Sequence, residues 1–154
     1  METLERLLLA HPFLAGLAPG LARQLAGCAR NLRFAPGDYL LREGEEADEF
    51  FLIRDGRIAL EMHVPSRPAV TIAALGAGDV VGASWLVPPY RWNFDARASA
   101  PSRAFGLDAN CLRAQCEADH HLGYEMMRRL LPVMVARMQA ARRQMLDVYG
   151  HRPA

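Results

Sequence analysis

The chain has 154 residues, the length of one domain, which is enough to bury a sizeable core without metal or disulfide cross-links. It is 51% hydrophobic and 23% charged, with a formal net charge of +1. These values exclude a disordered chain and a general nucleic-acid binder held by bulk charge. All 18 basic residues are arginine, and the absence of lysine excludes Schiff-base chemistry and the phosphate-binding lysine of a P-loop.

The cysteines and the N-terminal segment favour a cytoplasmic location. The segment is acidic, and its apolar stretch is broken by His11-Pro12, Gly16 and Pro19, so neither a signal peptide nor a membrane span is expected. The cysteines lack the spacing of a metal site, and we expect free thiols at Cys28, Cys111 and Cys116.

In chain order, the pattern predicts one α+β domain over residues 1–154. Leucines at helical spacing, interrupted by proline and glycine, predict short helices over residues 4–30. Turn residues then recur about every ten positions over residues 31–107, which predicts an antiparallel sandwich or barrel. The expected strands are Tyr39–Leu41, Phe50–Ile53, Ile58–Met62, Val70–Ala73 and a last one near Ala96–Leu107.

Helical periodicity returns over residues 108–148. Asp108 can cap a helix over residues 109–117, and Asp119 can cap a longer helix that reaches about Asp147. The expected architecture is therefore short helices, a β-barrel and a long C-terminal helix.

This order of elements and its turn residues resemble a cyclic nucleotide-binding domain of the Crp/Fnr (catabolite activator-like) family. The resemblance extends from about residue 4 to 148 and implies a jelly-roll barrel, also called a double-stranded β-helix, in a regulatory module. Because the sequence has no Gly-x-Ser-x-Gly, His-Glu-x-x-His or glycine-rich phosphate-loop motif, an enzyme is not expected. The segments that carry it are Leu8–Leu17, Phe34–Leu40, Arg42–Asp48, Phe51–Ile58 and Gly78–Gly82.

The family binds the phosphate of cAMP or cGMP in a cassette that corresponds here to residues 82–98. Gly82 fits its start, but Ala83 stands where nucleotide-binding members have glutamate, and the phosphate arginine would fall near Trp92 or Asn93. These departures disfavour ordinary cAMP binding. Arg91 is only one or two residues from the position expected for the phosphate arginine, so a short loop deletion could bring it there. The candidate ligand-binding residues are Gly82, Ala83, Ser84, Arg91, Trp92, Asn93 and Arg97.

Four aromatic residues of the cassette permit two interpretations. In the first interpretation the rings plug the pocket. In the second they stack on another planar or apolar effector, and Arg91 and the backbone amides of residues 82–84 would hold its anionic part. For Arg97, a structural ion pair is favoured over a ligand contact. The four aromatic residues are Trp85, Tyr90, Trp92 and Phe94.

A seven-residue apolar repeat in the last helix predicts a homodimer, because the resemblance also places the dimer interface there. The alternative is that this stripe packs only on its own barrel. Pro132 is expected to kink the helix, and Arg137 and Arg142, at g and e positions, would face each other as like charges across a parallel dimer. The repeat is formed by Met127, Leu131, Met134, Met138, Ala141, Met145 and Val148.

Between Glu125 and Asp147 the helix carries arginines but no acid, which indicates either a solvated face or a docking strip for an acidic protein or for nucleic acid. The family's transcription factors continue into a winged helix-turn-helix, whereas this sequence ends at Ala154, so sequence-specific DNA reading is not expected. The five arginines are Arg128, Arg129, Arg137, Arg142 and Arg143.

No metal site or resident cofactor is expected. Adjacent helical residues point about 100° apart, so His120 and His121 cannot share one closed site. If the chain does hold a cofactor, haem is the second candidate after a cyclic nucleotide. His63 and His120 would then be the axial ligands, but no sequence feature distinguishes them from other histidines.

Two functions follow from the sequence. The first is a sensor with a degenerate cassette, which binds a small effector without the usual Glu/Arg pair and signals through a dimerising helix. The second is a ligand-free interaction module with a sealed pocket, which docks a partner through its arginine-rich helix.

Overall fold

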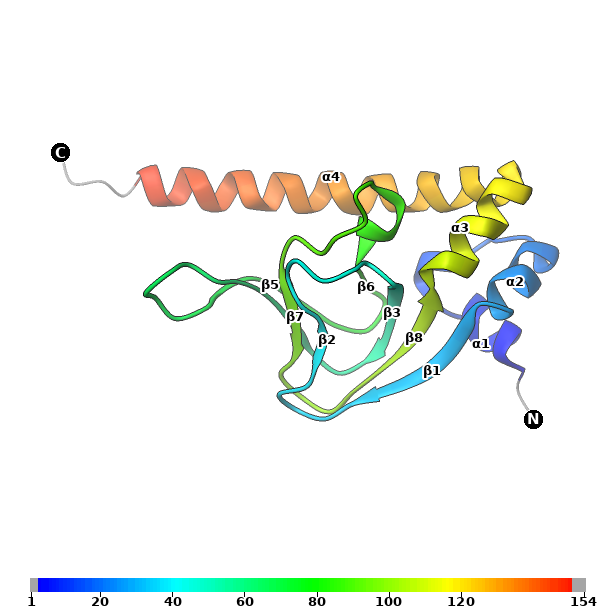
Figure 1. Ribbon diagram of the computed structural model, residues 1–154, viewed down its shortest axis with the longest axis horizontal. Coiled ribbons are helices and arrows are strands. Elements are labelled where there is room, and N and C mark those ends of the chain that lie inside the picture. Colours follow the sequence, from blue (N-terminus) through cyan, green and yellow to red (C-terminus); the bar gives the residue numbers. More distant parts are fainter. Residues whose placement is uncertain (1–2, 151–154) are drawn as a thin grey trace.

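The computed structural model describes residues 3–150 of the chain, and side chains up to residue 147. Three short helices, α1 (Leu4–Leu9), η1 (Pro12–Leu14) and α2 (Pro19–Ala26), precede eight strands, and α3 (Ala109–Ala118) and α4 (His120–Gly150) follow them (Figure 1). The strands are β1 (Ala29–Phe34), β2 (Tyr39–Leu41), β3 (Glu49–Asp55), β4 (Ile58–Met62), β5 (Val70–Leu75), β6 (Val80–Val81), β7 (Asp95–Ala98) and β8 (Ser102–Asp108), with the short helix η2 (Ala83–Leu86) between β6 and β7.

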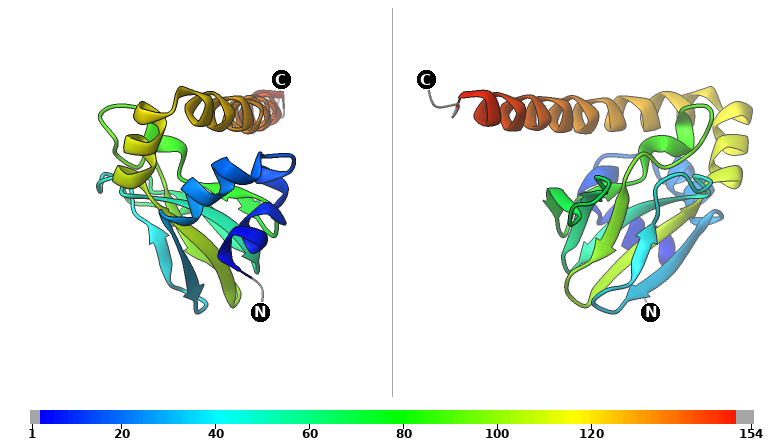
Figure 2. Two further views of the ribbon diagram at one scale, coloured as in Figure 1. Left: turned by 90° about the vertical axis from the view of Figure 1, so that its right-hand side faces the viewer. Right: turned by 60° about the vertical axis from the view of Figure 1, so that its left-hand side comes forward.

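The strands form two four-stranded antiparallel sheets, in the orders β1-β8-β3-β6 and β2-β7-β4-β5. The sheets face each other as a flattened barrel, the N-terminal helices lie against its outside, and α4 runs along the barrel and past its end (Figure 2). The predicted α+β fold class with a jelly-roll barrel and a long C-terminal helix is confirmed.

Two apolar clusters hold this arrangement. One fills the barrel and is built from the inward-facing residues of both sheets, such as Phe51, Ile58 and Ala96. The other joins the outer face of the first sheet to the N-terminal helices, α3 and the start of α4, through Phe50, Phe105 and residues such as Leu122. Because the start of α4 is part of this second cluster, the long helix is fixed to the barrel at one end.

The predicted last strand is wrong as a single element. It is divided into β7, which pairs with β2 and β4, and β8, which pairs with β1 and β3, so the chain changes sheets over residues 99–101. Pro101 has no N–H to donate to a continued ladder, so it fits a break at this point, although the change of sheets is set by the strands with which β7 and β8 pair. The barrel also begins earlier than expected, because β1 starts at Ala29.

The prediction of three free thiols is wrong for two of them. Cys28 and Cys111 form a disulfide with a Cα–Cα distance of 5.6 Å, which ties the start of β1 to the first turn of α3. Residues 83 positions apart in the sequence are not related by any local spacing rule, so the pairing follows only from the packing of α3 on β8. Cys116 is the free cysteine, and burial raises the pKa of its thiol.

The predicted helix caps are confirmed. The Asp108 carboxylate accepts from the backbone N–H of Cys111 at 2.8 Å, and the Asp119 carboxylate accepts from that of His121 at 3.0 Å. The long helix α4 is continuous through Pro132 (Figure 1). Among the described residues, no helix has both the length and the apolar character needed to cross a bilayer.

His11 makes the stability of the fold depend on pH. Its ring is buried, Nε2–H donates to the Ile53 carbonyl at 2.8 Å, and Nδ1 accepts from the Phe13 N–H at 3.2 Å. Desolvation lowers the pKa of His11, against the opposing effects of the Ile53 hydrogen bond and Asp79. The unfolded chain then binds the proton more readily, so stability is lost as the pH falls below about 6.5, by up to about 1.4 kcal/mol per pH unit.

Chemical denaturation of the wild type and of His11→Asn between pH 8 and pH 5 measures this effect. Asparagine keeps an acceptor for the Phe13 N–H but does not titrate, so the variant should lose the part of the pH slope that lies below about 6.5. Equal slopes in the two proteins would contradict the assignment to His11.

Candidate functional site

The cassette starts with a glycine that no other residue can replace without strain. Gly82 follows β6 and precedes η2 with a φ of +97°, in the left-handed region, and a Cβ at this position would lie 2.9 Å from the ring of Trp92. The close approach lets the Trp92 ring cover the start of η2. The geometry of the cassette is therefore specified by the pair Gly82 and Trp92.

Both tryptophans of the cassette belong to the protein interior. Trp92 is 4% exposed and lies in the cluster that fills the barrel, while Trp85 is fully buried in the outer cluster, with its ring centroid 5.7 Å from that of Phe50. The ring of Tyr90 faces the guanidinium of Arg113 at 4.3 Å. Trp92 therefore plugs the barrel, with Tyr90 and Phe94 packed against the same cluster, whereas Trp85 packs outside it.

The two cassette arginines contact different parts of the protein. Arg91 is exposed and donates to the Gly44 carbonyl at 3.4 Å. Arg97 forms an ion pair with the buried Glu61 at 3.0 Å, which confirms the structural role expected for it.

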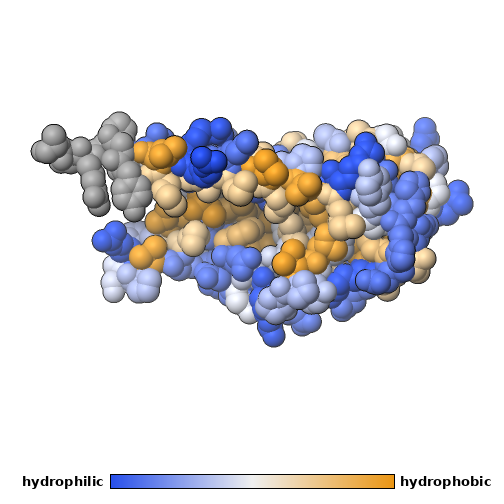
Figure 3. Space-filling view, turned by 90° about the horizontal axis from the view of Figure 1, so that it is seen from above, coloured by the Kyte–Doolittle hydropathy of each residue, from blue (hydrophilic) through white to orange (hydrophobic). Residues whose placement is uncertain are grey.

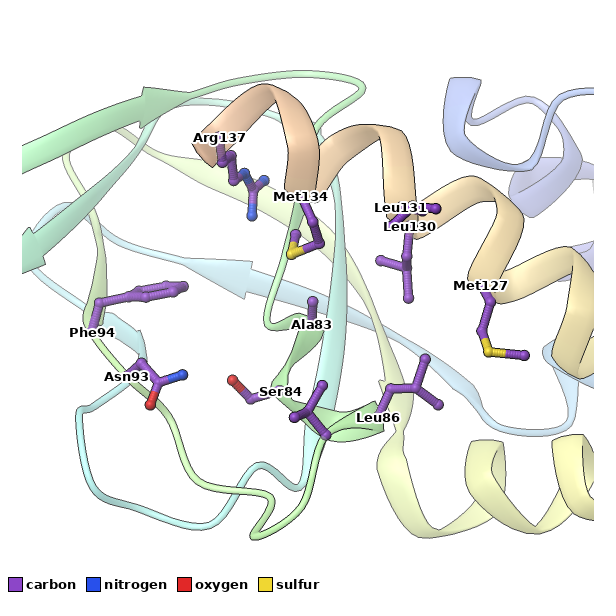
Figure 4. Close-up of a pocket in the computed structure, with 11 residues that line it drawn as sticks. Ala83, Ser84, Leu86, Asn93, Phe94, Met127, Leu130, Leu131, Met134 and Arg137 are labelled. Carbon is purple, nitrogen blue, oxygen red and sulfur yellow. The ribbon is translucent and has the colours of Figure 1, made fainter. Parts of the chain in front are cut away.

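A cavity of about 540 Å³ lies between the cassette and α4. Figure 4 shows residues of η2 and of the segment before β7 on one side and residues of α4 on the other, and Figure 3 shows a hollow beside α4 that is lined mainly by hydrophobic residues. Of the candidate ligand-binding residues, Ala83, Ser84 and Asn93 line it, whereas Gly82, Arg91, Trp92 and Arg97 do not. The other lining residues are Leu86, Val87, Phe94, Met127, Leu130, Leu131, Met134 and Arg137.

Arg137 is the charged lining residue, and sequence reasoning missed it as a site residue, as it missed Leu86, Val87 and Leu130. Its guanidinium turns from α4 toward the barrel and donates to the Val80 carbonyl, so it does not face a second copy as the heptad position suggested. Burial lowers the pKa of Arg137, with Asp79 opposing the shift. The signal was present in the sequence, because Leu130, Val133 and Arg137 follow one another at helical spacing on the barrel-facing side of α4.

The apolar repeat of α4 is mostly exposed. Met127, Leu131, Met138 and Met145 expose 52–65% of their surface, and Met134 is half-buried at the cavity. Most of the stripe is therefore left uncovered by its own barrel. The side chain of Val148 lies outside the described residues.

The arginine strip of α4 is partly neutralised within the helix. Glu125 lies 3.4 Å from Arg128 and 3.3 Å from Arg129, so among the five arginines only Arg142 and Arg143 are exposed without a described ion pair. The candidate haem ligand His63 instead lies 2.6 Å from Asp95. No cluster of three or more potential metal-ligating side chains occurs among those that the structure describes.

Comparisons with known proteins agree with this architecture. A structure of a putative cyclic nucleotide-binding protein from Geobacter metallireducens is similar with a TM-score of 0.78 and 25% identity, covering 89% of this chain and 99% of that one. The sensor domain of the transcriptional regulator DNR from Pseudomonas aeruginosa has a TM-score of 0.69, covering 88% of this chain and 91% of that chain. Its 18% identity shows a likeness of fold alone.

Sequence comparisons give the family. A cyclic nucleotide-gated cation channel protein of Drosophila melanogaster is 30% identical over 82 residues, which are 53% of this chain but only 11% of that protein, so the chain spans about a tenth of this relative. The family model described as "cyclic nucleotide-binding domain" matches residues 31–119, which include the barrel, the cassette and α3. The chain belongs to the cyclic nucleotide-binding domain family.

Proposed function

We propose that this chain is a non-catalytic sensor module, whose effector occupies the cavity between the cassette and α4 and whose signal passes through a dimerising α4. The observation that carries the proposal is the composition of the cavity wall. Cassette residues Ser84 and Phe94 lie on one side, and Met127, Leu131 and Met134 of the exposed repeat lie on the other. A molecule in the cavity would contact the barrel and the proposed dimer interface at the same time.

This arrangement supplies a physical link between binding and assembly. Three of the seven repeat residues line the cavity, and Leu131 is still 65% exposed. A second copy of α4 packed on this stripe would cover that apolar surface, so an effector that changes the packing of Leu131 and Met134 would bias the association of the two helices.

The effector proposed here is not cAMP held in the usual way. Ala83 offers no carboxylate for a ribose hydroxyl, Asn93 brings no charge to the cavity, and the Trp92 ring fills the barrel. We expect a calorimetric titration with cAMP at millimolar concentrations to give flat heats. Measurable one-to-one heat would show that the family's usual ligand still binds.

A neutral fluorescent probe, N-phenyl-1-naphthylamine, tests whether the cavity takes a ligand. We expect one probe per chain to bind with a rise in fluorescence. Ser84→Trp should fill the space and weaken binding on the order of tenfold or more, whereas Gln139→Trp, at an exposed position of α4, should not change it. Probe binding that Ser84→Trp leaves unchanged would contradict an effector in this cavity.

Light scattering tests the proposed helix interface. We expect the wild type to have twice the chain mass of 17.1 kDa and Leu131→Glu to have the mass of one chain. The reason is that burying an unpaired carboxylate in the interface between the two helices is costly. Ala136→Glu, exposed and on the opposite side of α4 from the repeat, is the matched control and should remain dimeric. A monomeric wild type would overturn the dimer.

The ligand-free interaction module is the second candidate, and the two buried tryptophans of the cassette favour it. It would dock an acidic partner through Arg142 and Arg143, which are exposed. Absence of binding by the naphthylamine probe, together with loss of partner binding when both arginines are changed to glutamate, would support this candidate over the sensor.

A further inference from the structure

Arg137 is a charged group in an apolar wall. It lies at one end of the cavity, and residues such as Leu130, Phe94 and Met134 form most of the remaining lining (Figure 4). Its guanidinium donates a hydrogen bond to the Val80 carbonyl, and it forms no ion pair with a carboxylate among the described side chains. A guanidinium has five N–H donors and stays protonated in proteins, so one carbonyl leaves most of its hydrogen-bonding capacity unused.

Leaving such a charge half-buried with no carboxylate in direct contact is unfavourable, because Asp79 favours the protonated form only through space. Three arginines of the strands have anionic partners: Arg97 pairs with Glu61, Arg30 with Glu49 and Arg103 with Asp55. Arg113, like Arg137, donates to a backbone carbonyl, but it lies outside this cavity and its guanidinium also contacts the ring of Tyr90. A carboxylate accepts two parallel hydrogen bonds from a guanidinium, and this geometry would neutralise the buried charge. The missing anion is therefore best supplied from outside the chain.

We propose that the cavity binds a monocarboxylate with an apolar body, whose carboxylate pairs with Arg137 and whose hydrocarbon part lies along Leu130, Met134 and Phe94. This inference rests on the proposed function and specifies the chemical class of its effector. Arg137 lies outside the cassette, on α4, so the anion would be held by the helix that carries the signal.

The rest of the lining selects against more polar anions. Ser84 and Asn93 are the other polar side chains of the cavity wall, and neither carries a charge. A phosphate monoester brings about two negative charges at pH 7, which one arginine cannot balance. An apolar body, in contrast, would recover the free energy of removing the exposed leucine and methionine surfaces from water.

Competition between matched probes tests the inference. Decanoate and decanol have the same chain length and differ in their head groups, so each is titrated against bound N-phenyl-1-naphthylamine at pH 7.5. We expect decanoate to displace the probe at a concentration about 10- to 100-fold lower than decanol does, the range expected for a hydrogen bond to a charged group. In Arg137→Gln the preference for decanoate should disappear while decanol still competes.

Two further variants separate the charge of Arg137 from a structural effect. Arg137→Lys keeps a cation and should keep part of the preference, while Arg128→Gln, which removes an exposed arginine of the same helix, should leave both affinities unchanged. Equal potency of decanoate and decanol on the wild type, or a preference that survives in Arg137→Gln, would overturn the anion site and leave the sensor function standing. Failure of the probe and both competitors to bind would overturn both proposals.

Discussion

Replacing Trp92 by alanine is expected to lower the free energy of unfolding by about 3–5 kcal/mol, the cost typical of emptying a buried aromatic site. The ring is 4% exposed, and it lies against Gly82 at the start of the cassette within the cluster that fills the barrel. Its removal would leave a void between two facing sheets that are close-packed and cannot collapse to fill it. Urea denaturation followed by circular dichroism measures the loss.

Trp92→Phe is the matched control, because it keeps an aromatic ring and leaves a smaller void, so we expect it to lose less than half as much stability. Arg91→Ala, next along the chain and exposed, should change the free energy of unfolding by less than about 0.5 kcal/mol. A loss below about 1 kcal/mol for Trp92→Ala would mean that the ring does not fill the barrel.

Removing the disulfide is expected to destabilise the protein by about 2–4 kcal/mol, because the Cys28–Cys111 bond closes a loop of 83 positions in the unfolded chain. We expect this loss of stability in Cys28→Ser and in Cys111→Ser. The double variant should lose the same amount as either single variant, because each of them already removes the bond. The free energy of unfolding is measured by urea titration under non-reducing conditions.

Cys116→Ser is the matched control, because Cys116 is half-buried and unbonded, and we expect a change below about 1 kcal/mol. Dithiothreitol should lower the stability of the wild type to that of the double variant and leave the double variant unaffected. A wild type whose stability does not respond to complete reduction would contradict this contribution.

Much of the fold was predictable because its signals are local. The strands Tyr39–Leu41 and Ile58–Met62 coincide with β2 and β4, and the capping aspartates Asp108 and Asp119 start their helices as expected. Each of these features depends on residues within a few positions of one another. The division of β7 from β8 and the Cys28–Cys111 bond depend instead on which distant segments pair, which periodicity does not encode.

The candidate site was only partly predictable for the same reason. The cassette could be located by its glycines, and the prediction that Ala83, Ser84 and Asn93 surround a ligand remains a prediction, although all three line the cavity. Arg137 could not be found by spacing within the cassette, because 44 positions separate it from Asn93 and only the packing of α4 on the barrel brings it to the same cavity.

Pro132 lies in α4 between the two cavity-lining residues Leu131 and Met134. It cannot donate the backbone hydrogen bond that would reach the Arg128 carbonyl, so the helix bends more easily at this level than elsewhere. The helix beyond Pro132 extends for roughly 27 Å, at a rise of about 1.5 Å per residue. A pivot of about 10° there would move the far end of α4 by about 5 Å, so a small change in the cavity wall would be amplified along the helix beyond Pro132.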